Sequence, residues 1–197
     1  AGNCAMIKPS ELVPTVSDVL NEMMTELYPQ EYIAVIEGDA ETSKALLEEK
    51  YDYIFFTGST HIGRSVMEQA AKHLTPVTLE LGGKSPCIVD DTANLTLAAK
   101  RIAWGKCLNA GQTCIAPDYL LVHESAKDEL IQQLKIHLTN TYTNNPLTNE
   151  NWPRIVNERH FDRILRLIEN ENVIAGGESD RKNLAIEPTL LDRVTWE

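Results

Sequence analysis

Hydrophobic residues form short continuous runs along the chain, and these runs alternate with longer segments in which hydrophobic residues recur at helical spacing. The continuous runs predict strands over residues 3–7, 32–36, 53–57, 77–81, 87–89, 119–122 and 188–191. The helical spacing predicts helices over residues 16–28, 41–50, 63–74, 95–108, 127–142 and 158–169. Strands that alternate with helices and are apolar throughout are typical of a parallel sheet covered on both faces. The pattern therefore predicts an α/β fold, with a nucleotide-binding half-domain over residues 1–81.

Two further features divide the chain. Residues 1–81 carry 5 basic and 13 acidic side chains, whereas the remaining residues carry 13 and 16, so the charge balance changes near residue 81. This shift indicates a boundary between two segments. The stretch 143–153 is rich in Asn and contains two Pro residues, which predicts a surface loop.

Composition excludes several classes of protein. With 43% hydrophobic residues the chain can build a core, and no apolar run reaches the roughly 20 residues that cross a bilayer. The net charge of −11 disfavours nucleic acid as a partner. The five histidines show no metal-ligand spacing, so no metal site is expected. The chain lacks an initiator Met and a signal peptide and begins within a strand-like run, which leads us to expect an internal fragment.

The four cysteines contain no CxxC pair, which indicates free thiols from a reducing compartment. Cys4, Cys87 and Cys107 lie within strand or helix patterns and are interpreted as small buried apolar residues. Cys114 instead ends the segment Asn-Ala-Gly-Gln-Thr-Cys in a Gly-containing loop, a position that favours reactivity. A buried packing role remains the alternative for Cys114.

Two other segments could carry chemistry. Gly58 and Gly63 lie between a strand and a helix, where the backbone can turn and the helix N-terminus can bind an anion, and Ser59 adds a hydroxyl group. The segment lacks the three-glycine dinucleotide fingerprint, so a plain strand-to-helix turn is the alternative. Glu80 lies between two leucines at the end of a predicted strand, which makes it a candidate general base. The alternative is a solvent-facing glutamate on an alternating strand.

Together these segments resemble the aldehyde dehydrogenase family. The resemblance is carried by residues 8–11 (Lys-Pro-Ser-Glu), 56–63, 79–84 and 109–114 in the family's order, and it extends through 117–119 and more loosely to Glu197. Glu80 and Cys114 stand 34 positions apart, as the family requires. Residues 72–87 resemble the class 3 branch, which accepts NAD or NADP. The resemblance implies part of a Rossmann-type nucleotide-binding domain, its C-terminal half over residues 1–81, followed by the N-terminal part of an α/β catalytic domain over residues 82–197.

The resemblance implies NAD(P)-dependent oxidation of aldehydes to carboxylic acids. Cys114 is then the nucleophile that attacks the aldehyde, and the resulting thiohemiacetal passes hydride to the nicotinamide and leaves a thioester. Glu80 is the base that activates water for hydrolysis. The backbone N–H of Cys114 helps to hold the oxyanion, and one such donor is typically worth ~3 kcal/mol.

The cofactor residues follow from the same resemblance. It implies that Lys8 and Glu11 contact the adenosine ribose, and a carboxylate at position 11 would repel a 2′-phosphate, which favours NAD over NADP. The resemblance also implies that the turn after the third predicted strand faces the pyrophosphate. The remaining cofactor contacts that it implies, in this turn and close to it, are Gly58, Ser59, Thr60, Gly63 and Leu81.

Two alternatives remain within the resemblance. A relative that passes the acyl group to coenzyme A is disfavoured by Glu80, because a water-activating base is needed only for hydrolysis. A non-catalytic structural relative, as among lens crystallins, is disfavoured by the presence of both Glu80 and Cys114. The family's Pro-Trp-Asn and Glu-Ile-Phe-Gly-Pro motifs lie outside this chain, so activity is expected of the parent and little of the fragment. The expected parent is a cytoplasmic homodimer acting on small aldehydes, and a C-terminal tail attaches some class 3 members to membranes.

Overall fold

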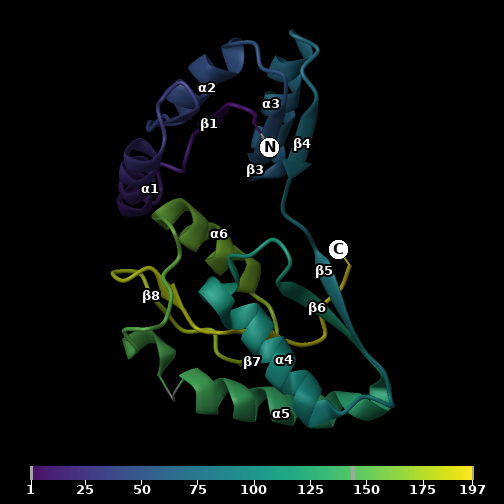
Figure 1. Ribbon diagram of the computed structural model, residues 1–197. Helices are drawn as coiled ribbons and strands as arrows, with labels where there is room; N and C mark the ends of the chain where they lie inside the picture. The colour runs from purple at the N-terminus through teal and green to yellow at the C-terminus, as the bar shows by residue number, and fades with distance from the viewer. Residues whose placement is uncertain (1, 143–144, 197) are drawn as a thin grey trace. The chain divides into compact units, whose positions relative to one another are not determined.

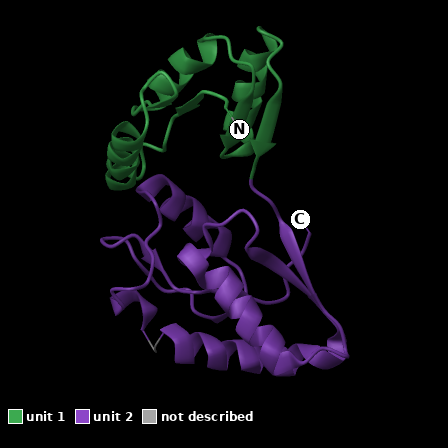
Figure 2. Ribbon diagram, viewed as in Figure 1, with its two compact units in different colours: residues 1–81 green, residues 82–197 purple. Residues whose placement is uncertain are grey.

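The computed structural model describes residues 2–142 and 145–196, which divide into two compact units, Ala1–Leu81 and Gly82–Glu197 (Figure 2). The structure leaves out Ala1, Thr143, Asn144 and Glu197. The first two residues of the predicted loop 143–153 and the outer ends of the predicted segments 1–81 and 82–197 therefore lie outside the described residues. The division falls between the same two residues as the predicted boundary. The roles of the two units as cofactor-binding and catalytic parts stay predictions.

The described part of the first unit contains two pairs of parallel strands connected through helices (Figure 1). Strand β1 (Ala5–Ile7) pairs with β2 (Ile33–Val35), and β3 (Ile54–Thr57) pairs with β4 (Val77–Glu80). The helices between them are α1 (Pro14–Leu27), α2 (Ala40–Glu48) and α3 (Thr60–Ala71). This succession is the predicted strand–helix alternation, with parallel pairing as expected.

Helix boundaries in this unit follow from local chemistry. Asp39 caps α2, since its carboxylate accepts hydrogen bonds from the N–H groups of Glu41 and Thr42. Ser59 caps α3, which therefore begins at Thr60. The sequence pattern predicted a start at Gly63, three residues later. The same helix ends at Ala71, short of the predicted end at Leu74, where the backbone turns left-handed with φ 55°.

The second unit is built around the parallel pair β5 (Ser85–Val89) and β6 (Pro117–Val122), against which α4 (Leu95–Cys107) and α5 (Glu124–Tyr142) pack. The predicted apolar stripes of both helices meet in this core, whose buried residues are Val89, Ala99, Ile102, Ala103, Leu130 and Leu134. The structure thus confirms the α/β class. The described residues do not by themselves cover both faces of these strands, because Phe55 on β3 of the first unit is 67% exposed and Ile88 on β5 is 74% exposed.

The rest of this unit is irregular. The sequence pattern predicted its helix, over residues 158–169, and its last strand, over residues 188–191, but missed its other short elements. The 3-10 turn η2 (Pro146–Thr148) and helix α6 (Glu158–Ile168) are followed by two antiparallel pairs, β8 (Ser179–Asp180) with β9 (Ala185–Ile186) and β7 (Val173–Ala175) with β10 (Leu190–Leu191). Strands of two or three residues are too short to show a period-2 pattern.

The described part of the predicted surface loop, residues 145–153, is partly buried. Trp152 is 6% exposed, its indole N–H donates to the Ile186 carbonyl at 3.0 Å, and its ring lies 5.0 Å from that of Tyr142. Cys107 belongs to the same buried cluster. The polar composition of this segment concealed one aromatic anchor that fixes it to the core.

Candidate active site

Cys114 follows a backbone turn with an unusual conformation. After α4 the chain forms η1 (Leu108–Gly111), in which Asn109 has φ 52° and ψ 36°, Ala110 has φ 53° and ψ 32°, and Gly111 has φ 77°. Only glycine adopts this left-handed region freely, and a non-glycine residue there costs about 1–2 kcal/mol. Backbone strain of this kind is concentrated at functional sites in proteins. Three residues after this turn, Cys114 is exposed.

The start of the second unit passes directly beside Cys114. A Cβ atom placed on Gly83 would lie 3.3 Å from the Cys114 carbonyl oxygen, so the absence of a side chain at Gly83 permits a close backbone approach. The pairing of β5 with β6 opposes Ser85 and Pro117 and brings these segments together. The segment 79–84 therefore reaches the Cys114 loop through its last two residues.

Three charged side chains lie close to one another near this contact between Gly83 and Cys114. Lys84 forms an ion pair with the carboxylate of Asp118, and the Lys106 ammonium nitrogen lies 3.9 Å from the same carboxylate. Asp118 lies in the segment 117–119 that resembles the family, but the sequence pattern predicted no role for Lys84, Lys106 or Asp118. The available signal was their spacing, since Lys84 follows the Gly pair directly and Asp118 follows Cys114 by four positions.

The other cysteines differ from Cys114 in environment. Cys107 is 4% exposed, and burial raises the pKa of its thiol to about 11, so the thiol stays protonated at neutral pH. Cys87 is half-buried, and burial raises its pKa as well. The interpretation of Cys4 as a buried apolar residue is wrong, because Cys4 precedes β1 and is exposed.

Glu80 is the last residue of β4, where it is paired in register with Thr57 of β3 and is exposed to solvent. Its backbone carbonyl accepts a hydrogen bond from the N–H of Gly58 at 3.0 Å. Glu80 is thereby fixed beside the β3–α3 turn within the first unit. Glu80 belongs to the first unit and Cys114 to the second.

The β3–α3 turn has the features of an anion site. Gly58 precedes the cap Ser59, whose hydroxyl oxygen accepts from the Ile62 N–H at 3.4 Å, and Thr60 opens the twelve-residue helix α3. Gly63 is buried in the first turn of α3, and a Cβ atom there would lie 2.7 Å from the Leu81 side chain. The glycine lets Leu81 pack against the helix start. A helix N-terminus carries partial positive charge, so the residues present here fit a pyrophosphate.

Lys8 and Glu11 lie in the segment that follows β1. The Lys8 ammonium nitrogen lies 2.9 Å from a Glu11 carboxylate oxygen and also donates to the Pro9 carbonyl at 2.9 Å. The hydrogen bond from Lys8 holds the pKa of the Glu11 carboxyl below its ordinary value, so the carboxylate stays charged at neutral pH. This pair presents one cationic donor and one anionic acceptor within a short loop.

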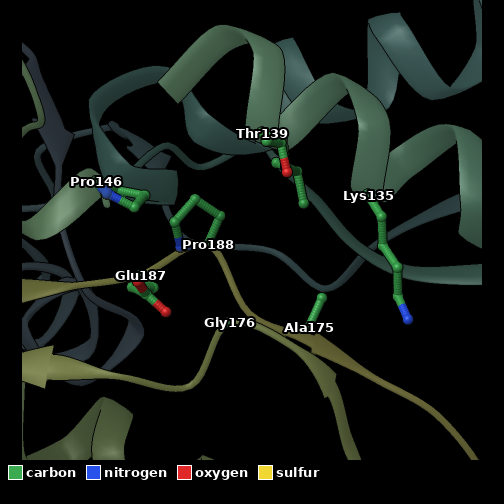
Figure 3. A pocket seen from close by; sticks show the side chains of 8 residues that line it. Lys135, Thr139, Pro146, Ala175, Gly176, Glu187 and Pro188 are labelled. Atoms are coloured by element: carbon green, nitrogen blue, oxygen red, sulfur yellow. The ribbon is translucent and has the colours of Figure 1, made fainter. Parts of the chain in front are cut away.

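A separate cavity of about 280 Å³ lies in the second unit between α5, η2 and the segment around β7 (Figure 3). Lys135, Glu187 and Pro188 are among its lining residues, and the predicted site residues do not line it. Across residues 2–142 and 145–196, no group of three or more His, Cys, Asp or Glu side chains could hold a metal ion. Among the helices in those ranges, none is both long and apolar enough to traverse a bilayer.

The sequence profile of the aldehyde dehydrogenase family matches residues 1–197, and the chain belongs to this family. The chain is 50% identical over 197 residues to the 4,4'-diaponeurosporen-aldehyde dehydrogenase of Staphylococcus aureus, an alignment that covers 99% of this chain and 43% of that protein. It is 45% identical to the mouse protein named "aldehyde dehydrogenase, dimeric NADP-preferring", with 97% of this chain and 42% of that protein covered.

Solved structures show the same relationship. A substrate-bound Staphylococcus aureus AldH superposes with a TM-score of 0.93 at 49% identity over 98% of this chain and 43% of that chain. An NAD-dependent aldehyde dehydrogenase from Sinorhizobium meliloti superposes with a TM-score of 0.86 at 32% identity over 98% of this chain and 40% of that chain. These comparisons confirm the family and the fold class. The chain spans about two fifths of the length of these relatives.

Proposed function

We propose that this chain forms part of an enzyme that oxidises small aldehydes to carboxylic acids with a nicotinamide dinucleotide. The observation that carries the proposal is the exposed Cys114 shortly after a strained turn, in a chain that belongs to the aldehyde dehydrogenase family. Of the cysteines, Cys114 alone combines exposure with a position in one of the motifs that resemble this family.

In the proposed reaction, the Cys114 sulfur attacks the aldehyde carbonyl carbon, and the carbonyl oxygen takes up negative charge near the Cys114 N–H. The product is a thiohemiacetal anion on Cys114. NAD or NADP, when bound, supplies the acceptor for the hydride that leaves the aldehyde carbon. Cys114 then carries the acyl group as a thioester, which is readily attacked by water.

Glu80 completes the reaction in this proposal. Its carboxylate takes a proton from water, the hydroxide attacks the thioester carbon, and the carboxylic acid leaves as the Cys114 sulfur is regained. The family membership of the chain, together with the match of residues 79–84 and 109–114 to the family's motifs, supports this role of Glu80.

The cofactor is proposed to bind the first unit. The N-terminus of α3 with Gly58, Ser59 and Thr60 would hold the pyrophosphate, and Gly63 with Leu81 keeps the helix start closely packed. Lys8 and Glu11 would hold the adenosine ribose. The negative charge of Glu11 would repel a 2′-phosphate, so we propose NAD as the preferred form, although one relative is named NADP-preferring. The name of that relative also supports a homodimer.

The test uses the product of the complete gene. A panel of aliphatic and aromatic aldehydes is assayed with NAD and with NADP, and the assay is repeated with Cys114→Ser and with the matched control Cys4→Ser, whose thiol is also exposed. Loss of turnover in Cys114→Ser alone is expected. Undiminished turnover in Cys114→Ser would refute the proposal.

Product analysis addresses the second candidate reaction. Formation of free acid, with no requirement for coenzyme A, is expected if Glu80 activates water. Acyl-coenzyme A as the sole product would favour the acyl-transfer relative and would remove the proposed role of Glu80.

A further inference from the structure

Gln112, two residues before Cys114, uses its side-chain amide to connect two distant parts of the second unit. Its Nε2 atom donates to the Asn109 carbonyl and to the Arg154 carbonyl, both at 3.0 Å. Its Oε1 atom accepts from the Val156 N–H at 3.0 Å. One amide thus satisfies three backbone groups and ties the Cys114 loop to a segment more than forty positions away in the sequence.

The segment that receives these bonds is itself fixed. Ile155 is 3% exposed, and its N–H donates to the Leu184 carbonyl at 2.8 Å. The Arg154 guanidinium donates to the Asn183 carbonyl at 3.0 Å and to its side-chain oxygen at 2.7 Å. Asn183 in turn donates to the Asp180 carboxylate at 2.6 Å. Residues 154–156 are therefore anchored to the turn between β8 and β9.

The Cys114 loop requires such an anchor. Asn109 and Ala110 both hold left-handed conformations, which persist in non-glycine residues only where the surroundings enforce them. The Gln112 N–H donates to the Asn109 carbonyl at 3.1 Å, and the Asn109 amide donates to the Gln112 carbonyl at 3.3 Å. These two bonds close the turn. Among the described residues, the Gln112 side chain joins the closed turn to residues 154 and 156 by hydrogen bonds, and Ala110 adds an apolar contact with the cluster that contains Ile155.

We propose that Gln112 is a positioning residue for Cys114: its amide bonds to residues 154–156 fix the loop that holds the sulfur and the backbone N–H at the reacting carbonyl. The role rests on the proposed function of Cys114 as the nucleophile. Gln112 acts through the backbone. An amide is required because the position needs two donors and one acceptor, whereas a carboxylate offers only acceptors and leucine offers neither.

The test compares Gln112→Leu and Gln112→Glu with Gln132→Glu, a control on the exposed side of α5, in the product of the complete gene. Hydrogen exchange in the peptide spanning residues 108–116 reports the loop without reference to catalysis. Alkylation of the buried Cys107 reports whether the surrounding core stays folded.

We expect both Gln112 variants to speed amide exchange in residues 108–116 by about tenfold, since they lose the hydrogen bonds that hold the loop closed. We expect kcat to fall by about 10–100-fold, because a displacement near 1 Å can cost that much. KM for NAD should stay within about twofold, a split that indicates a lost transition-state interaction. Gln132→Glu should match the parent in every measurement.

Unchanged exchange in residues 108–116 would overturn the proposal, and so would faster exchange with unchanged kcat. Rapid alkylation of Cys107 in both variants would assign Gln112 a role in stability alone and would equally overturn it. If the parent protein oxidises no aldehyde, the proposed function fails, while the exchange result still decides whether Gln112 holds the loop.

Discussion

Replacing Gly111 with alanine tests the turn that presents Cys114. Gly111 has φ 77°, and the added Cβ would lie 3.1 Å from the Lys106 carbonyl oxygen and 3.3 Å from its Cε atom. An L-residue in this region costs about 1–2 kcal/mol. The close contact with the last turn of α4 adds to that cost. We expect the free energy of unfolding of the second unit to fall by about 1–2 kcal/mol, a change of about 5–30-fold in its folding equilibrium.

Tryptophan fluorescence in urea measures this change selectively, because Trp104, Trp152 and Trp196 all belong to the second unit. The matched control is Gly82→Ala, where the added Cβ meets open space and the backbone is not left-handed. A compatible Gly→Ala change stabilises by about 0.4–1 kcal/mol, so the two substitutions should shift the urea midpoint in opposite directions. Equal midpoints for the two variants would refute the idea that the turn is strained.

The remaining predictions concern other parts of the chain. At pH 7, iodoacetamide should modify the exposed Cys4 and spare the buried Cys107, whose pKa is raised to about 11; equal labelling in peptide mass spectrometry would contradict the described core. Trp152→Phe removes the donor to the Ile186 carbonyl and should cost about 1–3 kcal/mol in urea unfolding, and no loss would show that this bond is not needed. The pKa of the Glu11 carboxyl is lower in the folded unit than in the unfolded chain. Its pairing with Lys8 therefore stabilises the first unit fully above the unfolded pKa, and this stabilisation is lost as pH falls through the folded pKa. The thermal midpoint of that unit, followed by circular dichroism, should therefore depend more weakly on pH below about 4.5 in Glu11→Gln than in the parent, and identical pH profiles would argue against the pair. Glu11→Gln should also raise the affinity for NADP relative to NAD in a cofactor titration, which an unchanged ratio would disprove.

The long elements could be predicted from the sequence because their patterns are local. The apolar stripe of α4 at residues 95, 98, 99, 102 and 103 has helical spacing, and the structure places it against the core. The parallel pairing of β5 with β6 followed from alternation with helices. Boundaries were less accurate, since the cap at Ser59 moved the start of α3 by three residues.

The rest depends on tertiary contacts that no local pattern records. The left-handed conformations of Asn109 and Ala110 are held by hydrogen bonds to and around Gln112, and the anchor at Arg154 lies far away in the sequence. The burial of Trp152 similarly depends on Ile186. Motif spacing identified Cys114 as a candidate, but the hydrogen bonds that fix its loop to residues 154 and 156 could be found only from the structure.

The most direct test of the account is the mass of the covalent intermediate in Glu80→Gln. The variant protein is mixed with an aldehyde and NAD, quenched and digested, and each cysteine-containing peptide is weighed. We expect one burst of reduced cofactor and an acyl adduct on the peptide that contains Cys114, with the mass of the aldehyde less two hydrogens. Reduced cofactor formed without an adduct, or an adduct confined to Cys4, Cys87 or Cys107, would contradict it.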